Sequence, residues 1–418
     1  MEKRRVAVVG LGAVCPVGNS VDAAWEAIKS GTSGIGRITC FDTTTYPVKI
    51  AGEVKGFSVE DYGIERKVVR KMARFTQLVV ASSVQAVSDA KLSREELSRR
   101  GAGVCVGNCM GGLDAVDEGY RKLRSSDTGH SKISPLTVPL WISSEAAANV
   151  SIFFGLQGPS YEVGTACASG TDAIGIGADL IKSGRLDVCL AGATEASLTE
   201  FNIASLMQLQ ALTTSGNDTP TKASRPFDAT RDGFVFSEGA AVLVLEEMTS
   251  AVKRGAHIYA EVAGYGSSCD AYHITAPLAD GSGAALAMRR ALEDAAVSPE
   301  KIDYYNAHGT ATMLNDIAET RMLKAVFGES AKELSVSSTK SMTGHMIAAA
   351  GAVEAVFCIK AIEEGFVPPT INLDHPDTQN GLDLDYTPNV GHPRKIDFAA
   401  SASLGFGGHN GCLIFKAI

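Results

Sequence analysis

Short apolar segments rich in β-branched residues alternate with longer segments rich in alanine and glycine along the whole sequence. The short segments have the composition of buried strands, and the longer ones have that of helices. This alternation is typical of α/β layers, and no linker, low-complexity tract or short-period repeat interrupts it. Strands are predicted at Val6 to Val9, Ala102 to Val106, Val188 to Ala191, Ala241 to Leu245, Ile258 to Gly264, Ile302 to Asn306, Leu334 to Ser337 and Gly411 to Phe415.

The two halves of the chain share a pattern of strand, turn and helix. The segment 160–165 leads into a glycine-spaced helix at Cys167, and the segment 334–340 leads into His345 and a predicted helix over 346–362. A chain of 418 residues is long enough for two domains or one duplicated unit. We therefore predict two similar halves, residues 1–255 carrying the cysteine and 256–418 carrying two histidines, with both turns at one pseudo-symmetric centre.

Cys167 lies in the run Gly-Thr-Ala-Cys167-Ala-Ser-Gly at the expected start of a helix. The first amides of a helix are unpaired and carry partial positive charge, which favours a thiolate and leaves donors for an oxyanion. A buried, inert thiol is the commoner fate of any one of the nine cysteines. Taken alone, the motif leaves a nucleophile and a structural cysteine equally open.

Two histidine motifs favour the nucleophile. His308 in Asn-Ala-His308-Gly-Thr follows the strand that begins at Ile302, and His345 in Thr-Gly-His345 follows a second strand-to-helix turn. A histidine beside glycine at the end of a strand points into a crevice rather than a core. A lone histidine is more often structural, but two such motifs together with Cys167 indicate a catalytic site.

Composition and charge exclude several other classes. With 45% hydrophobic and 20% charged residues the chain resembles a soluble globular enzyme, and its net charge of −9 disfavours nucleic acid as a partner. The apolar run from Val6 to Gly12 is too short for membrane insertion, and Gly10-Leu11-Gly12 lacks the third glycine of a dinucleotide site. The odd, scattered cysteines never form a Cys-x-x-Cys pair, so we predict reduced thiols, a cytoplasmic location and no metal site.

Four motifs together resemble the β-ketoacyl-acyl carrier protein synthases in order and spacing. They are Gly-Thr-Ala-Cys167-Ala-Ser-Gly, Asn-Ala-His308-Gly-Thr, Ser-Ser-Thr-Lys340-Ser-Met-Thr-Gly-His345 and Gly-Phe406-Gly-Gly. The resemblance is strongest to the chain-elongating synthases II of bacterial fatty acid synthesis and spans nearly the whole chain. It implies a thiolase-like αβαβα layered sandwich of two pseudo-symmetric halves, normally a homodimer.

The resemblance also implies the reaction, a decarboxylative Claisen condensation of malonyl-acyl carrier protein with an enzyme-bound acyl thioester. Cys167 carries the acyl group, and the backbone amides of Cys167 and Phe406 hold the oxyanion. His308 and His345 donate N–H groups to the enolate left by the loss of carbon dioxide. No cofactor is implied beyond the phosphopantetheine of the carrier.

Other positions match the family less specifically. Lys340 belongs to its inner polar network with Glu354 as carboxylate partner, although a purely structural pair is the alternative. The remaining substrate-binding candidates are Thr275, Thr310 and Thr312 for the phosphopantetheine arm, and Met110, Thr137 and Leu206 near the acyl pocket. Loop hydroxyls more often form turns.

A basic stripe is predicted in the segment 65–74. Lys67, Arg70, Lys71 and Arg74 are spaced as neighbours on one helix face. Such a stripe is usually an ordinary solvated surface. Because Lys67, Arg70 and Lys71 match the family's docking patch, we predict that they bind the acidic acyl carrier protein.

Three residues depart from the family pattern, and four other kinds of protein are alternatives to a chain-elongating synthase. Ala311, Leu404 and His409 replace a usual serine, phenylalanine and threonine, so the sequence does not define the acyl chain length. A thiolase would use a second catalytic cysteine, and an initiating synthase primed by coenzyme A carries asparagine in place of one histidine. A non-catalytic chain-length partner lacks the nucleophile. A dedicated polyketide or polyene ketosynthase with the same site is the main alternative.

Overall fold

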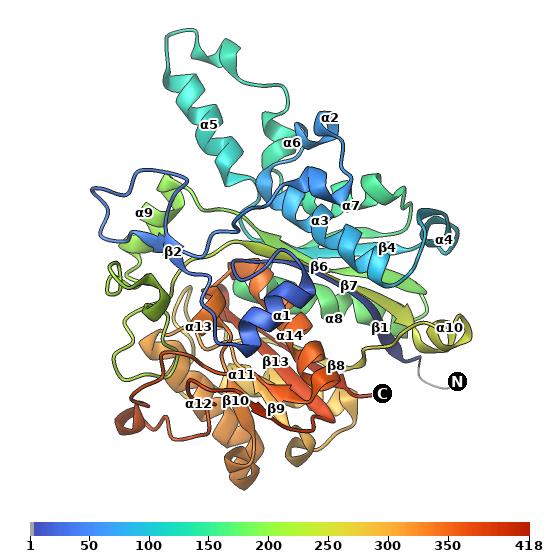
Figure 1. The fold of residues 1–418 in the computed structure, drawn as a ribbon, viewed down its shortest axis with the longest axis vertical. Coiled ribbons are helices and arrows are strands. Elements are labelled where there is room, and N and C mark those ends of the chain that lie inside the picture. Colours follow the sequence, from blue (N-terminus) through green and yellow to red (C-terminus); the bar gives the residue numbers. More distant parts are fainter. Residues whose placement is uncertain (1–3) are drawn as a thin grey trace.

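Ten strands form one continuous mixed sheet in the computed structural model, which describes residues 4–418 (Figure 1). In spatial order they are β10 (Ser335–Ser337), β9 (Tyr304–Asn306), β13 (Phe398–Gly405), β14 (His409–Lys416), β8 (Ala260–Cys269), β1 (Val6–Val14), β7 (Gly239–Glu247), β6 (Val188–Glu195), β4 (Gly103–Gly107) and β5 (Ser160–Val163). Two small ribbons pair β2 (Gly36–Arg37) with β3 (Ile50–Ala51) and β11 (Phe366–Val367) with β12 (His392–Pro393).

The sheet consists of two copies of one topology. The order β1-β7-β6-β4-β5 in the first half has its counterpart in β8-β14-β13-β9-β10 in the second. In both copies the first three strands are antiparallel and the last three are parallel. The copies meet where β1 pairs with β8, through Ala7 opposite Glu261 and Val8 opposite Ala260. The predicted duplication is therefore confirmed.

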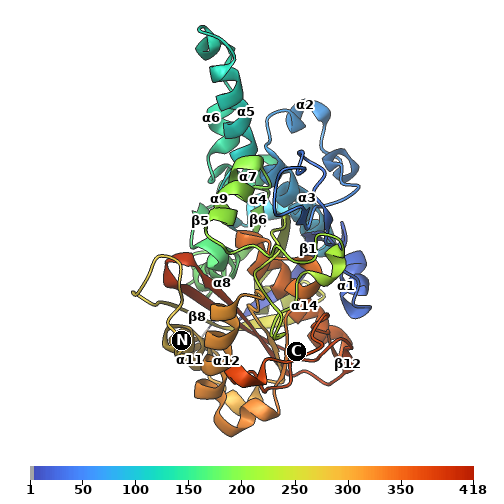
Figure 2. The ribbon, with the colours of Figure 1, turned by 90° about the vertical axis from the view of Figure 1, so that its left-hand side faces the viewer.

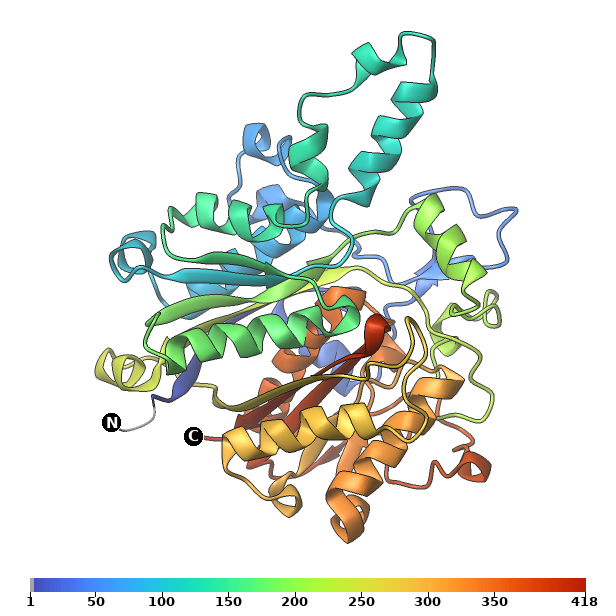
Figure 3. The same ribbon diagram turned by 180° about the vertical axis from the view of Figure 1, so that it is seen from behind.

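Three pairs of helices cover the two half-sheets (Figures 1 and 3). One outer layer holds α3 (Arg74–Asp89) and α7 (Glu145–Phe154), the middle layer holds α8 (Ser169–Lys182) and α14 (Ala350–Glu364), and the other outer layer holds α11 (Ser282–Ala295) and α12 (Met313–Phe327). Each half-sheet is thus enclosed on both faces, and the layers run α, β, α, β, α. This is the predicted layered sandwich.

The remaining helices lie around these layers. They are α1 (Val21–Lys29), α2 (Arg66–Val69), α4 (Arg94–Arg99), α5 (Leu113–Arg124), α6 (Thr137–Trp141), α9 (Glu200–Gln208), α10 (Met248–Lys253) and α13 (Lys340–Thr343). The α5 and α6 segment projects from the body as an arm (Figure 2). None of the helices in the described chain is long and apolar enough to cross a bilayer.

Glycines let the two middle helices touch at their first turns. A methyl group on Gly351 of α14 would lie 2.2 Å from Oγ1 of Thr171 in α8, and one on Gly170 would lie 2.7 Å from the carbonyl oxygen of Ala348. No larger residue fits at either position without separating the helices. Because the helices meet at their N-terminal ends, the turns that precede them are brought together at the centre of the molecule.

All eight predicted strands are present, most with ends displaced by a few residues. The sequence did not predict β13, which reads Phe-Ala-Ala-Ser-Ala-Ser-Leu-Gly and lacks β-branched residues. Five consecutive residues of this strand are buried between helical layers, where small side chains satisfy the packing. The predicted helix over 346–362 begins as a short 3-10 turn and continues as α14.

The predicted basic stripe on one helix is wrong. Helix α2 ends at Val69 and α3 begins at Arg74, so the segment contains a break. The Arg74 guanidinium turns inward and donates to both carboxylate oxygens of Glu238, each at 2.6 Å. Lys67 and Arg70 stay exposed on the surface, whereas the partly exposed Arg74 is paired with the buried carboxylate of Glu238.

Candidate active site

Cys167 lies in a strained turn between β5 and α8. It belongs to the 3-10 turn Ala166–Ala168 and is buried, with 6% of its surface exposed. Ala166 has a left-handed φ of 51°, which is uncommon for a residue with a side chain. The turn is held by the Ser169 hydroxyl, which donates to the Ala166 carbonyl and accepts from the Thr165 N–H. The second half repeats this strain before α14, where Ile347 has φ 45°.

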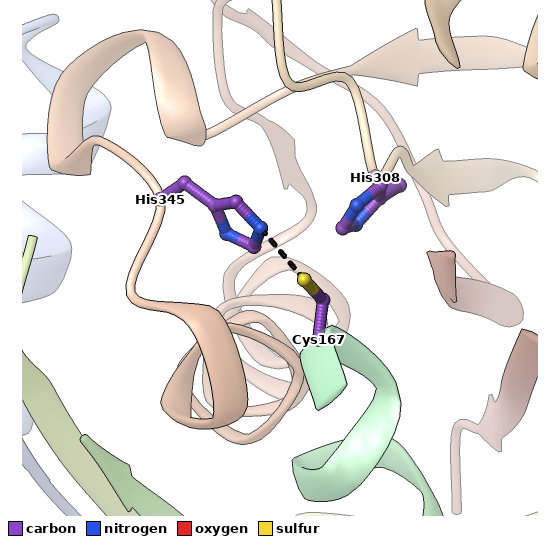
Figure 4. Close-up of side chains that lie close together, drawn as sticks. All are labelled: Cys167, His308 and His345. Atoms are coloured by element: carbon purple, nitrogen blue, oxygen red, sulfur yellow. Dashed lines mark hydrogen bonds between the residues drawn. The ribbon is translucent and has the colours of Figure 1, made fainter. Parts of the chain in front are cut away.

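His345 faces Cys167 from the equivalent turn of the second half (Figure 4). Its Nε2 lies 3.1 Å from the Cys167 Sγ, although 178 positions separate the two residues. The backbone N–H of His345 donates to the Val235 carbonyl oxygen at 2.7 Å, and the ring stands edge-on to Phe234. These contacts fix the imidazole over the thiol.

His308 completes the group from the end of β9. Its ring centroid lies 5.2 Å from that of His345, nearly perpendicular to it, and both rings point toward Cys167 in Figure 4. The turn is held by Glu319, whose carboxylate accepts from the backbone N–H groups of His308 and Gly309 at 2.7 and 2.8 Å. Three residues from separate motifs therefore share one buried site.

Glu319 was not singled out from the sequence, although a signal was available. It lies on the same face of α12 as Met322 and Leu323, which are fully buried. A carboxylate on an apolar helix face must find donors inside the protein. The sequence could therefore have predicted that Glu319 is buried and accepts hydrogen bonds. It could not have predicted that the donors are the backbone N–H groups of the His308 turn.

Burial and one lysine determine the protonation of the site. Burial, together with the positive charge of Lys340, lowers the pKa of both His308 and His345 well below that of an ordinary histidine. Burial raises the pKa of the Cys167 thiol to about 11, while Lys340 and the Phe406 backbone N–H act in the opposite direction. Neutral imidazoles and a thiol therefore predominate at neutral pH.

Lys340 is itself buried and forms an ion pair with Glu354. Both side chains are 1% exposed, and the lysine Nζ donates to Oε1 of the carboxylate. Burial raises the pKa of Glu354, and the charge of Lys340 opposes this effect. The structure thus contains the pair of Lys340 and Glu354 that the sequence predicts.

Phe406 brings a backbone amide to the nucleophile. It lies in the 3-10 turn Phe406–Gly408 after β13, and its backbone N–H acts to lower the pKa of the Cys167 thiol. The preceding Gly405 packs against the cysteine turn, so that an added methyl group would lie 3.1 Å from the Cys167 nitrogen. The glycine thus permits the close approach of the two backbones.

A cavity of about 360 Å³ opens onto these groups. Its walls include the predicted substrate-binding residues Met110, Leu206, Thr275, Thr310 and Thr312. The hydroxyl oxygens of Thr310 and Thr312 lie 3.0 Å apart. Thr137 is not among the lining residues; a methyl group on Gly119 of α5 would meet its Cγ2 at 3.3 Å.

The cavity also contains residues that the sequence did not mark. Cys109 lines it just after β4, and Asn410 and Asp270 line it near the Phe406 turn. Asn410 donates through Nδ2 to Asp270 Oδ1 at 2.7 Å, and the other oxygen of Asp270 accepts from the Leu278 N–H. Asp270 begins the segment Asp-Ala-Tyr-His-Ile-Thr275, in which only Thr275 was predicted to bind substrate, and its place in that segment could have marked it as a residue of the same wall.

Cys167, His308 and His345 could also be considered as metal ligands, because their ligating atoms lie within 4.8 Å of one another. Histidines that bind metals usually donate their second ring N–H to a carboxylate or a carbonyl. In the described chain, Nδ1 of neither His308 nor His345 has a hydrogen-bond partner. This donor set therefore fits a metal centre poorly.

Two parts of the chain match models of known protein families. Residues 3–251 match "Beta-ketoacyl synthase, N-terminal domain" and residues 259–374 match "Beta-ketoacyl synthase, C-terminal domain". The chain belongs to the β-ketoacyl synthase family. One relative of this synthase is the 3-oxoacyl-[acyl-carrier-protein] synthase 2 of Vibrio cholerae, 46% identical over 418 residues and covering all of both chains.

Solved structures agree with this membership. The ishigamide ketosynthase/chain length factor has 34% identity and a TM-score of 0.93, with both chains fully covered. A type II polyketide ketosynthase in complex with its acyl carrier protein has 35% identity and a TM-score of 0.91, again over both full chains. The predicted thiolase-like fold is confirmed.

The predicted reaction class is confirmed as well. The enzyme is an acyltransferase that performs the synthase II condensation of fatty acid elongation. The family to which it belongs acts on substrates bound to acyl carrier protein.

Proposed function

We propose that Cys167 carries the acyl group during this condensation, and the observation that supports it best is the 3.1 Å contact between its Sγ and Nε2 of His345. In the loading step the thiol proton passes to Nε2 and Sγ attacks the carbonyl carbon of the acyl thioester. The bond from that carbon to the phosphopantetheine sulfur then breaks, and the leaving thiolate takes the proton from Nε2. The N–H groups of Cys167 and Phe406 stabilise the tetrahedral oxyanion, and losing one such donor costs about 2.7 to 4 kcal/mol.

In the condensation step His308 and His345 stabilise the enolate. When malonyl carrier protein loses carbon dioxide, the electron pair of the broken C–C bond enters an enolate, whose oxygen accepts N–H groups from both imidazoles. The carbanion then attacks the acyl carbon on Cys167, and Sγ leaves as a thiolate. Nδ1 of each imidazole lacks a hydrogen-bond partner in the described chain, so no neighbour there fixes the tautomer. Nε2 of His345 can therefore accept a proton in the loading step and donate an N–H in the condensation step.

Lys340 and Glu354 tune this site rather than contact the substrate. The positive charge of Lys340 lowers the pKa of both imidazoles and so keeps them neutral. A neutral imidazole can still donate one N–H hydrogen bond to the substrate. The threonines of the cavity wall, Thr275, Thr310 and Thr312, bind the phosphopantetheine arm. Met110 and Leu206 contact the acyl chain.

The acyl carrier protein docks on Lys67, Arg70 and Lys71. All three side chains are exposed, at helix α2 and the turn that follows it. An acidic carrier would be attracted to this local basic patch in spite of the overall charge of −9. One structural relative was solved with its acyl carrier protein, which supports a direct encounter of this kind.

The active form is a homodimer joined at β5. At the other end of the sheet β10 is covered, because the Val336 N–H donates to the Asp385 carbonyl. Within residues 4–418 the outer edge of β5 is unpaired, and Tyr161 on this strand and Ile152 of α7 are exposed apolar residues beside it. An uncovered edge strand is a template for pairing, so a second copy adds its own β5. Sedimentation should show a dimer that Tyr161→Lys converts to monomer; an unchanged dimer would place the interface elsewhere.

The division between the halves falls between residues 255 and 256, in the connection from α10 to β8.

All nine cysteines are free thiols, which supports a location in the reducing cytoplasm. A dedicated polyketide ketosynthase is less favoured, because identity to those solved structures is 34 to 35%, against 46% to the fatty acid synthase of Vibrio cholerae.

The decisive test is intact-mass detection of the acyl-enzyme after incubation with acylated carrier proteins of several chain lengths. Cys167→Ala should abolish both the adduct and condensation without unfolding the chain. Cys109→Ala is the matched control, because Cys109 lines the same cavity and should not carry the acyl group. An adduct on the Cys167→Ala variant would contradict the assignment, as would loss of the adduct from the control.

A further inference from the structure

Asn108 occupies the first position after β4 and is tied to both neighbouring strands. Its side chain is fully buried, and its Nδ2 donates to the Thr194 carbonyl oxygen of β6 at 2.7 Å. Its backbone N–H donates to the Val163 carbonyl oxygen of β5 at 3.2 Å. Thr194 is held in turn, because its hydroxyl donates to the Phe75 carbonyl oxygen at 2.7 Å. Asn108 is therefore fixed to the sheet by buried hydrogen bonds on both sides.

The same side chain also closes the turn that follows β4. Oδ1 of Asn108 accepts from the Gly111 N–H at 2.6 Å. This hydrogen bond spans Cys109 and Met110, and both of these residues line the cavity of the active site. Asparagine side chains often hold turns in this way, by bonding to the backbone a few residues ahead. One amide group thus connects the sheet to the part of the cavity wall that Cys109 and Met110 form.

The end of this turn packs against the backbone of α6. A methyl group on Gly111 would lie 2.2 Å from the Trp141 carbonyl oxygen, and one on Gly112 would lie 2.0 Å from the Leu140 carbonyl oxygen. The Gly112 N–H donates to the Trp141 carbonyl oxygen at 3.2 Å. Only glycine permits this approach of one backbone to another. The turn is therefore held by two elements, the sheet through Asn108 and α6 through direct contact.

We propose that Asn108 is a positioning residue that holds Cys109 and Met110 as a fixed wall of the cavity, and that this wall limits the length of the acyl chain on Cys167. The inference rests on the proposed contact of Met110 with the acyl chain. Asn108 acts through the turn, since it is not among the residues that line the cavity. A tightly packed wall excludes a chain that would overlap it. Without the amide group the turn loses its hydrogen bonds to Thr194 and Gly111 and yields to a longer chain.

The test is a competition between two carrier proteins at equal concentration, one loaded with an octanoyl chain and the other with a hexadecanoyl chain. Intact mass of the full-length enzyme resolves the two Cys167 adducts, and their initial ratio is the ratio of kcat/KM for the two chains. We expect Asn108→Ala to raise the proportion of the hexadecanoyl adduct about fivefold, the effect of one buried hydrogen bond. The rate with the octanoyl carrier alone should change less than about twofold, because Cys167 and His345 are unaltered.

Asn217→Ala is the matched control. The Asn217 amide also joins two backbone groups, since its Nδ2 donates to the Pro47 carbonyl oxygen at 2.7 Å and its Oδ1 accepts from the Lys49 N–H at 3.0 Å. Asn217 is not among the residues that line the cavity, so the adduct ratio should stay that of the native enzyme. Asn108→Ser is a milder variant for the case that Asn108→Ala does not fold. Its hydroxyl can still accept from the Gly111 N–H, so the ratio should rise by a smaller factor.

A double variant separates positioning of the wall from a general loss of structure. Met110→Ala shortens the wall directly and should also favour the hexadecanoyl adduct. Adding Asn108→Ala to Met110→Ala should then change the ratio by less than about twofold, because the wall is already lost. An unchanged ratio in the Asn108 variants, an equal loss of rate with both chains, or full additivity in the double variant would overturn the proposal. Failure of the native enzyme to acylate Cys167 with either chain would instead reject the proposed function.

Discussion

Replacing Lys340 by methionine tests how strongly the site depends on its buried ion pair. Lys340 and Glu354 are each 1% exposed, so the pair is not screened by water as a surface pair would be. Removing one partner of such a pair typically costs roughly 3 to 5 kcal/mol of unfolding free energy, because the other charge is left uncompensated. An exposed pair would cost about 1 kcal/mol at most. We expect the larger figure, with recovery when Glu354→Gln is added to Lys340→Met.

The penalty should grow with pH. Burial raises the pKa of Glu354 in the folded state, and without Lys340 no nearby positive charge opposes this effect. Between the ordinary glutamate pKa of about 4.3 and the raised value, the folded variant binds a proton that the unfolded chain has released. Stability of the variant therefore falls as pH rises through that window. Urea unfolding of the native enzyme and of the single and double variants at pH 6 and pH 8 measures the difference.

The same substitution should change the pH profile of the reaction. The charge of Lys340 contributes to the lowered pKa of His308 and His345, so its removal raises both values. The acid limb of malonyl decarboxylation should then move to higher pH, because the imidazoles become charged earlier on acidification. A stability cost below about 1 kcal/mol, no recovery in the double variant, or an unmoved acid limb would refute this reasoning.

Three other outcomes can be measured directly. His308→Ala should suppress malonyl decarboxylation while largely sparing acyl loading, whereas His345→Ala should slow both steps because its Nε2 contacts the nucleophile; equal effects of the two variants on loading would contradict this division. Reversing Lys67 and Arg70 to Glu should raise KM for carrier-linked substrates at low salt without changing alkylation of the nucleophile, and an unchanged KM would move the docking surface elsewhere. Gly351→Ala, whose methyl group would lie 2.2 Å from a side chain of α8, should cost about 1 to 3 kcal/mol in urea unfolding. A variant as stable as the native chain would show that the helices can separate freely.

The sequence by itself determined the alternation of strands and helices, the duplicated pattern and the three motifs of the site. These features are local, since each is carried by a run of neighbouring residues with a recognisable period or composition. Cys167, His308 and His345 could therefore each be marked as chemically active. The strand β13 could not be found in this way, because its small residues suit its buried position in the sheet rather than any strand-forming pattern.

Only the tertiary structure decided how these residues act on one another. The 3.1 Å contact between Cys167 and His345 arises because α8 and α14 meet at glycines, and their turns carry residues 178 positions apart. The inward turn of Arg74 toward Glu238 likewise depends on a partner far along the chain. Burial and neighbouring charge set the pKa of each group, and both quantities depend on what surrounds a side chain in space rather than on its neighbours in sequence.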